Sequence, residues 1–263
     1  AAALHLKIEA MRRAYADALD LVADPERAAV PLEAMLSKAY AAERRREIGP
    51  RAGAVAAGAP LEVGPDTVYF CAVDGQGNGC SMINSNYEGF GTGIVPAGCG
   101  FTLQNRGLNF SLDEGHPNAL APRKRPYHTI IPGLVTRPGR SSLYATFGVM
   151  GGFMQPQGHL QVVSNMVDGG MDPQEALDAP RFCLADVGAS QSARDVAASR
   201  VYVEEGIPEA IIEELRARGH EAIGPVRGHD RAVFGRGQII FRDEAGVLWG
   251  GSEPRADGCA LGF

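Results

Sequence analysis

A β-strand with a threonine close to its start is predicted by the stretch Pro65-Asp66-Thr67-Val68-Tyr69-Phe70-Cys71-Ala72-Val73-Asp74. Most of its residues are β-branched or aromatic, and such side chains favour the pleated, half-buried surface of a sheet. The glycine-dense run Asp74-Gly75-Gln76-Gly77-Asn78-Gly79 follows, and then a second strand from Cys80 to about Ser85. Glycine, asparagine and aspartate favour tight turns, so the sequence predicts a β-hairpin. On this local pattern Thr67 is an ordinary strand-opening residue.

Length and composition are typical of a soluble globular protein. The chain has 263 residues, of which 45% are hydrophobic and 21% charged, enough for one large domain or two small ones. A net charge of −6 argues against a nucleic-acid partner. The basic run Arg44-Arg45-Arg46 has acidic neighbours, which predicts a solvated helix face. No apolar run approaches the roughly 18 residues of a membrane span, so no membrane partner is expected.

Neither a metal site nor a cofactor site is predicted. The chain has five cysteines without C-x-x-C spacing: Cys71, Cys80, Cys99, Cys183 and Cys259. Such spacing suggests neither a zinc site nor a disulfide framework. The glycine run 75–79 lacks the Lys-Ser/Thr ending of a phosphate-binding loop. No signal peptide is visible, so the cytoplasm is the expected compartment, with the periplasm and secretion left open.

The order of the predicted elements indicates an α+β fold. Apolar residues recur every three to four positions from Leu4 to Val22, which predicts an amphipathic helix ending at Asp24-Pro25. A second helix is predicted from Pro31 to Arg46, with Leu32, Leu36, Ala39 and Tyr40 on its buried side, and then a linker from Gly49 to Pro65. Downstream of the hairpin, strands are predicted at 129–135, 143–149, 201–203, 238–241 and 247–249, and helices near 160–167, 173–177 and 208–218. This grouping differs from alternating βαβ units.

Six segments carry a resemblance to a known family: Thr67–Asp74, Phe90–Val95, Lys124–Pro126, Gly148–Gly152, Ala179–Phe182 and Ser252–Arg255. In order and spacing they resemble the small subunit of the gamma-glutamyltransferase family, which belongs to the N-terminal-nucleophile (Ntn) hydrolases. Residues 1–66 resemble the end of that family's large subunit, through Glu9–Asp17 and Val30-Pro31. The resemblance implies a four-layer αββα sandwich. It divides the chain into a large-subunit-like tail, 1–66, and a small-subunit-like catalytic region, 67–263.

The resemblance also implies an activation step and a mechanism. Thr67 matches the nucleophile, and its hydroxyl would first cut the chain between Asp66 and Thr67 through an ester intermediate. The freed α-amine would then act as general base, because an unassisted hydroxyl is a weak nucleophile at neutral pH. Ser85 falls where the family has a hydroxyl that hydrogen-bonds the nucleophile. Gly151 and Gly152 match the pair whose backbone N–H groups form the oxyanion hole.

The predicted substrate pocket departs from the family's glutamate-recognising members. Those enzymes bind the α-amino group with an asparagine and an acidic residue, and the α-carboxylate with two serines. The corresponding positions here are Tyr87, Asn109, His128 and Thr129. Arg106, on the same segment, suits bidentate binding of a carboxylate, although a structural ion pair is an equal alternative. His128 alone is more typical of a structural histidine.

Three functional hypotheses follow. The first is an amidohydrolase that self-cleaves before Thr67 and hydrolyses a small carboxylate-bearing amide through a threonyl acyl-enzyme. The second is a true gamma-glutamyl transferase or glutathione hydrolase, and the third is a non-catalytic binding or structural member. The family carries a long region upstream of the tail in residues 1–66, including an arginine that contributes to carboxylate binding. That large-subunit region is the expected partner, and an oligomer of such heterodimers is compatible with the sequence.

Overall fold

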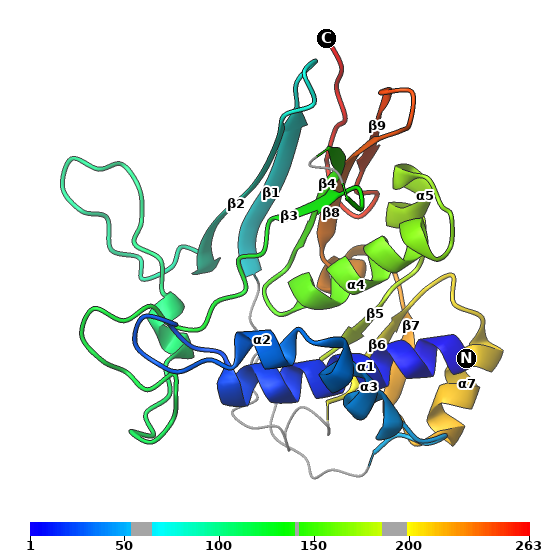
Figure 1. The fold of residues 1–263 in the computed structure, drawn as a ribbon, viewed down its shortest axis with the longest axis horizontal. Coiled ribbons are helices and arrows are strands. Elements are labelled where there is room, and N and C mark those ends of the chain that lie inside the picture. The colour runs from blue at the N-terminus through cyan, green and yellow to red at the C-terminus, as the bar shows by residue number, and fades with distance from the viewer. Residues whose placement is uncertain (54–64, 140–141, 186–198) are drawn as a thin grey trace.

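The predicted hairpin is present in the computed structural model, which describes residues 1–53, 65–139, 142–185 and 199–263. Strands β1 (Pro65–Val73) and β2 (Gly79–Glu88) pair antiparallel (Figure 1). The second strand runs on to Glu88, past its predicted end at Ser85. Asp74 closes the turn, because its carboxylate accepts the backbone N–H groups of Gln76 and Asn78, both at 2.9 Å. The predicted linker falls largely on residues 54–64, outside the described residues.

The largest sheet among the described residues is antiparallel and has four strands. Its order is β3 (Gly133–Thr136), β4 (Leu143–Met150), β8 (Arg236–Arg242) and β9 (Leu248–Ser252). The predictions for the last three are confirmed. The strand predicted at 129–135 begins only at Gly133, because the N–H of Ile131 donates to the Gln155 side chain at 3.2 Å and Pro132 has no N–H.

Helices cover one face of this sheet and the hairpin lies on the other. Helices α4 (Met154–Val167) and α5 (Pro173–Asp178) pack against β4, β8 and β9 (Figure 1). The core between them consists of Phe147, Val149, Val162, Met166, Ala176, Leu177 and Ile239. On the opposite face the ring of Tyr69 lies over Gly148, where a Cβ would come within 2.5 Å of ring atoms. The described residues thus contain three successive layers: helix, sheet and hairpin.

A second unit is built on the N-terminal helix. Helix α1 (Ala2–Leu21) packs on a three-stranded sheet of β5 (Phe182–Leu184), β6 (Val201–Glu204) and β7 (Ala222–Val226), with α7 (Glu209–Ala217). The predictions of α1, β6 and α7 are confirmed, whereas β5 and β7 were not predicted. Their shared core is Ile8, Met11, Tyr15, Phe182, Leu184, Val201, Val203, Ile212, Leu215 and Ala222. The tail and the region after Thr67 are therefore parts of one folded body.

The helix predicted from Pro31 to Arg46 is instead two helices, α2 (Leu32–Met35) and α3 (Lys38–Arg46). The break occurs because the Ser37 hydroxyl accepts the backbone N–H of Tyr40 at 3.1 Å and so caps a new helix. The predicted buried side was also wrong, since Leu32 is 59% and Leu36 75% exposed. Among the described residues, no helix combines the length and apolar character needed to cross a membrane.

Candidate active site

Thr67 and Ser85 face each other across the hairpin. The strand register pairs them, and their hydroxyl oxygens lie 2.8 Å apart. Both side chains are half-buried and lie on the same face of the hairpin as buried Tyr69, which points toward β4. The hairpin thus brings together two residues that the resemblance assigned to catalysis, and their hydroxyls are hydrogen-bonded.

A β-bulge lies opposite the predicted cleavage bond. Asp66 pairs with Tyr87 but Thr67 pairs with Ser85, so Asn86 is an extra residue in β2. Tyr87 has a φ of 80°, a left-handed conformation that is strained for a side chain of this size. In this conformation its backbone N–H donates to Ser85 Oγ at 2.9 Å. Bulges recur beside active sites because they redirect a side chain, and the sequence contained no signal for this one.

Arg106 joins this hydroxyl pair. It lies in the short 3₁₀ helix η1 (Arg106–Asn109), and its Nη2 donates to Ser85 Oγ at 3.0 Å. Its guanidinium carbon lies 4.7 Å from the centroid of the Tyr87 ring, a cation–π contact. Arg106 is only 5% exposed, and this burial lowers the pKa of its guanidinium. Its Nη1 is buried and has no hydrogen-bond partner among the described residues, nor does Arg106 make an ion pair with any of them.

Two of the predicted substrate-binding residues bind each other. The Tyr87 hydroxyl donates to Asn109 Oδ1 at 2.8 Å, and Asn109 Nδ2 donates to the carbonyl of Tyr127 at 3.0 Å. Burial raises the pKa of the Tyr87 phenol. The role of Tyr127 was not predicted, because a backbone carbonyl acceptor leaves no mark on residue type. The side chains of Tyr87 and Asn109 therefore form a wall whose polar groups are already engaged.

The predicted substrate-binding residues His128 and Thr129 differ in exposure and in hydrogen bonding. His128 is exposed, and its Nδ1 accepts the backbone N–H of Ile130 at 3.3 Å. Partial desolvation and the charges of Arg106 and Arg125 lower its pKa, which places it in the electric field of Arg106. Thr129 is 1% exposed, and its hydroxyl has no hydrogen-bond partner among the described residues.

Gly151 and Gly152 form the turn between β4 and α4. Their φ values are 139° and 57°, and a Cβ on Gly151 would lie 3.2 Å from the Cα of Gly235. Two contacts relate this turn to the hairpin: Tyr69 lies over Gly148, and Gly79, the partner of Val73, lies over Thr146. Strand β1 of the hairpin therefore runs along β4 in the opposite direction to β4. This register indicates that Thr67, two residues before Tyr69, lies level with the end of β4, where Gly151 begins the turn.

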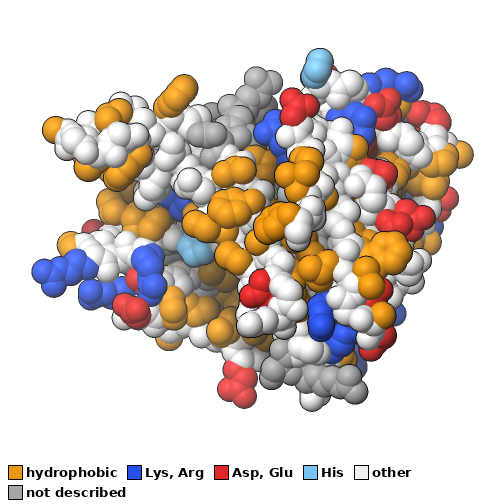
Figure 2. Space-filling view, turned by 90° about the horizontal axis from the view of Figure 1, so that it is seen from above, with side chains coloured by type: hydrophobic (Ala, Val, Ile, Leu, Met, Phe, Trp, Pro, Cys, Tyr) orange, Lys and Arg blue, Asp and Glu red, His pale blue; other side chains and the backbone are white. Residues whose placement is uncertain are grey.

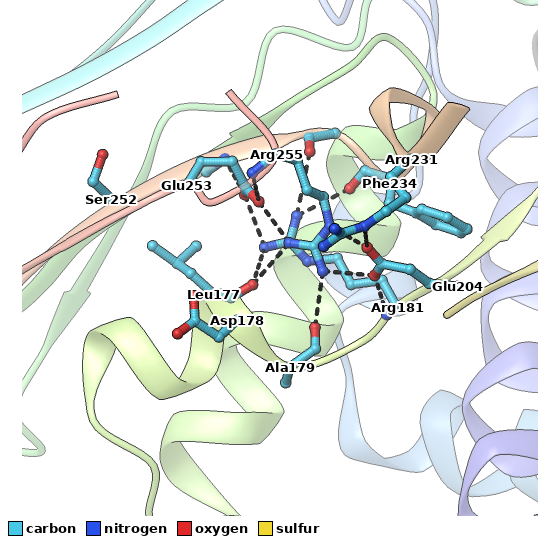
Figure 3. A network of polar contacts seen from close by, with 12 residues as sticks. Leu177, Asp178, Ala179, Arg181, Glu204, Arg231, Phe234, Ser252, Glu253 and Arg255 are labelled. Atoms are coloured by element: carbon cyan, nitrogen blue, oxygen red, sulfur yellow. Dashed lines mark hydrogen bonds and ion pairs between the residues drawn. The ribbon is translucent and has the colours of Figure 1, made fainter. Parts of the chain in front are cut away.

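A buried network of charges (Figure 3) contacts the Phe234-Gly235 segment, which packs against this turn. Arg181 pairs with Glu253 at 3.0 Å and donates to the carbonyl of Phe234 at 3.0 Å. Arg255 pairs with both Glu253 and Glu204, and all four charged side chains are at most 1% exposed. The neighbouring Gly235 abuts the carbonyl of Met150, since a Cβ there would be 2.5 Å from that oxygen. The Ala179–Phe182 and Ser252–Arg255 segments thus have a structural role that sequence reasoning did not predict.

Comparison with known proteins gives the family. A family model described as Gamma-glutamyltranspeptidase matches residues 1–263, and the chain belongs to this family. It is 36% identical over 262 residues to the "Glutathione hydrolase-like YwrD proenzyme" of Bacillus subtilis, covering 98% of this chain and 47% of the relative. It is 32% identical to the "Oxamate amidohydrolase proenzyme" of Klebsiella pneumoniae, covering 99% of this chain and 47% of the relative.

A solved structure supports the same assignment. The cephalosporin acylase from Bacillus halodurans is 46% identical with a TM-score of 0.81, and the match covers 97% of this chain and 44% of the acylase. The fold is thus the α+β sandwich of the Ntn hydrolases. The chain spans about half the length of the curated relatives it matches.

Proposed function

We propose that this protein is an Ntn amidohydrolase that is activated by cleavage between Asp66 and Thr67. Thr67 Oγ1 attacks the substrate amide carbonyl, the C–N bond breaks, and the proton of the hydroxyl passes through the freed α-amine to the departing amine. Water then attacks the resulting ester, which releases the acid and restores the hydroxyl. The observation that carries this proposal is the 2.8 Å contact between Thr67 and Ser85 opposite the bulge.

The proposed substrate is a short amide that bears a carboxylate. Arg106 supports this, because its buried guanidinium has an N–H group without a partner among the described residues, and such a group favours an anionic partner. Hydrogen bonds of 2.8 and 3.0 Å connect Thr67 Oγ1 through Ser85 to Arg106 Nη2, so the two groups lie within about 6 Å of each other. An acyl group held between them must be short. The relative named oxamate amidohydrolase has 32% identity to this chain.

Glutathione hydrolysis is the competing function, since several relatives carry that name. It requires recognition of a glutamyl ammonium group. Asn109 is neutral, and its amide oxygen already accepts from Tyr87. An anionic partner for an ammonium contributes about 1.5–3 kcal/mol. The wall formed by Tyr87 and Asn109 has no such anionic group. The geometry therefore favours the carboxylate-bearing amide.

Residues 1–66 and 67–263 are proposed to remain associated after cleavage, as the large-subunit-like tail and the small-subunit-like region. The support is the core shared by α1 with β5 and β6, in which Ile8, Met11 and Tyr15 are buried. The partner in the complete protein is proposed to be a large-subunit region.

A substrate panel tests the proposal. Ammonia release from oxamate and succinamate is compared with anilide release from γ-glutamyl-p-nitroanilide, with Thr67→Ala as the blank. We expect kcat/KM for the best carboxylate amide to exceed that for the anilide by about 10-fold or more. Preference for the anilide would establish the glutathione-hydrolase alternative. No turnover, together with no labelling of Thr67 by an electrophile, would support the non-catalytic one.

A further inference from the structure

The contacts of Ser85 favour one direction for its hydrogen bond with Thr67. A serine hydroxyl has one hydrogen to donate and two lone pairs to accept. Arg106 Nη2, at 3.0 Å, and the backbone N–H of Tyr87, at 2.9 Å, can only donate, so they occupy both lone pairs of Ser85 Oγ. Two donors on Ser85 Oγ favour Ser85 as the donor and Thr67 Oγ1 as the acceptor in the 2.8 Å contact between them.

We propose that Arg106 is a positioning residue for the nucleophile, which acts through Ser85 in addition to any contact with substrate. By occupying an acceptor position of Ser85, its cation directs the Ser85 hydrogen onto Thr67 Oγ1. A cation that donates to Ser85 also polarises its O–H bond and strengthens the bond to Thr67. This inference rests on the proposed function, because it assigns a role in the same reaction.

Donation to Thr67 Oγ1 favours each step in which that oxygen carries negative charge. During self-cleavage the bond from Oγ1 to the Asp66 carbonyl carbon forms, the C–N bond breaks, and the hydroxyl proton moves to the Thr67 nitrogen. During deacylation the ester bond breaks and Oγ1 regains a proton. A hydrogen bond from Ser85 stabilises the charged form in both steps without proton transfer. The proton of Thr67 itself is left to point toward the base.

The surroundings hold Arg106 in place for this role. Its guanidinium stacks on the Tyr87 ring, and the ring is fixed by the bond from its hydroxyl to Asn109. The bulge at Asn86 places the strained Tyr87 so that its N–H and its ring act on Ser85 and Arg106 together. Backbone strain of this kind persists only where the surrounding contacts enforce it.

Self-cleavage measures this role without any substrate to bind. In the complete protein, the rate of cleavage before Thr67 is compared for the wild type, Arg106→Met, Ser85→Ala and the double variant. We expect each single variant to slow cleavage by about 10- to 100-fold, as for loss of a charge-assisted hydrogen bond. We expect the double variant to be no slower than Ser85→Ala, because Arg106 acts through that hydroxyl. Multiplying effects would overturn the proposal.

A matched control separates this role from general destabilisation. Arg137 also stacks on a tyrosine, with its guanidinium carbon 5.3 Å from the centroid of the Tyr144 ring, away from Thr67. Arg137→Met should leave the cleavage rate unchanged. Arg106→Lys, which retains a cationic donor, should recover part of the rate. Millimolar methylguanidinium should restore cleavage in Arg106→Ala but not in Ser85→Ala.

The outcomes also separate this inference from the proposed function. If Arg106→Met cleaves at the wild-type rate but has a raised KM for carboxylate amides, Arg106 only binds substrate and the positioning role is wrong. If methylguanidinium and lysine both fail to restore cleavage while Arg106→Met unfolds like the wild type, the role is likewise refuted. If the wild type itself does not cleave, the proposed function fails instead.

Discussion

Asn109 is the residue where substrate preference is most open to a direct test. It lies behind Tyr87 and accepts that residue's hydroxyl, while its amide nitrogen is held by the carbonyl of Tyr127. The family's glutamate-recognising members have an acidic residue at this position. A neutral amide leaves a substrate ammonium group without an anionic partner.

Replacing Asn109 by aspartate should therefore shift preference toward glutamyl substrates. A carboxylate can still accept from Tyr87, so the wall should persist. We expect the kcat/KM ratio of γ-glutamyl-p-nitroanilide over oxamate to rise by about 10-fold or more. Asn109→Ala is the control, since it removes the amide without adding charge. An unchanged ratio in Asn109→Asp would show that this position does not contact the ammonium group.

At the scale of elements, two buried histidines join α1 to the segment that follows α7 and to the start of the predicted linker. Arg12 can only donate, so His220 Nδ1, 3.2 Å from Arg12 Nη1, accepts. His220 Nε2 then carries the hydrogen and donates to His5 Nδ1 at 2.7 Å, and His5 Nε2 donates to the carbonyl of Gly49 at 2.9 Å. When both rings are neutral, each of their four nitrogens has one hydrogen-bond partner. A proton added to either Nδ1 would point at the N–H group that now donates to that nitrogen.

This arrangement predicts loss of stability in acid. Burial, then Arg12, lowers the pKa of His220 to about 4, against the opposing charge of Glu9 and with smaller contributions from His5 and Arg218. The unfolded chain takes up this proton near pH 6.5 and the folded chain does not, so stability falls as the pH drops from 6.5 to 4. The full loss is on the order of 3 kcal/mol.

Urea unfolding at pH 7.5 and 4.5 checks the histidine prediction. His220→Gln should show a smaller change in unfolding free energy between these pH values than the wild type. Replacing exposed His229 by Gln should give the same difference in unfolding free energy between the two pH values as the wild type. Equal pH dependence in wild type and His220→Gln would contradict the assignment to the histidine pair.

The elements that the sequence predicted are those whose signal is local. Helix α1 and strands β1 and β4 repeat their apolar residues over many positions, and the structure places them as predicted. The predicted burial of Leu32 and Leu36 was wrong, because periodicity shows that a helix has an apolar side but not what covers that side. Strands β5 and β7 have only three and five residues, too few for a pattern.

The features of the candidate site also fall into those that the sequence predicted and those that it did not. Thr67, Ser85 and the two glycines were found through the resemblance. The contact between Arg106 and Ser85 joins residues 21 positions apart through a short 3₁₀ helix, and no local pattern encodes it. No sequence pattern predicts the bulge at Asn86 either.

At the scale of the whole molecule, the outer face of the hairpin is apolar and uncovered by the described residues. Val68 is 53% exposed, and Phe70 and Met82 are each 47% exposed, on the side away from β4. Phe90, Ile94 and Phe101 in the following loop are more exposed still. Figure 2 shows hydrophobic side chains spread over much of the face that it displays. Exposed apolar side chains gathered on one face of a hairpin are typical of an interaction surface.

Residues 1–263 expressed alone should therefore associate. We expect light scattering to show species larger than a monomer. The pair Phe70→Ser and Met82→Ser should reduce their size, because both side chains point outward and little core packing is lost. The pair Leu6→Ser and Val167→Ser, which are also exposed but lie in helices α1 and α4, should have less effect. A monodisperse, cooperatively unfolding monomer would refute this prediction.

The proposed function requires that Thr67 becomes an N-terminal residue whose hydroxyl acts as the nucleophile. Intact mass and N-terminal sequencing of the purified complete protein, after a day at neutral pH, test it most directly. We expect a fragment beginning Thr-Val-Tyr-Phe, with Thr67→Ala remaining uncut under the same conditions. A wild-type chain that stays uncut would refute this role of Thr67, because its α-amine would never be released to act as the base.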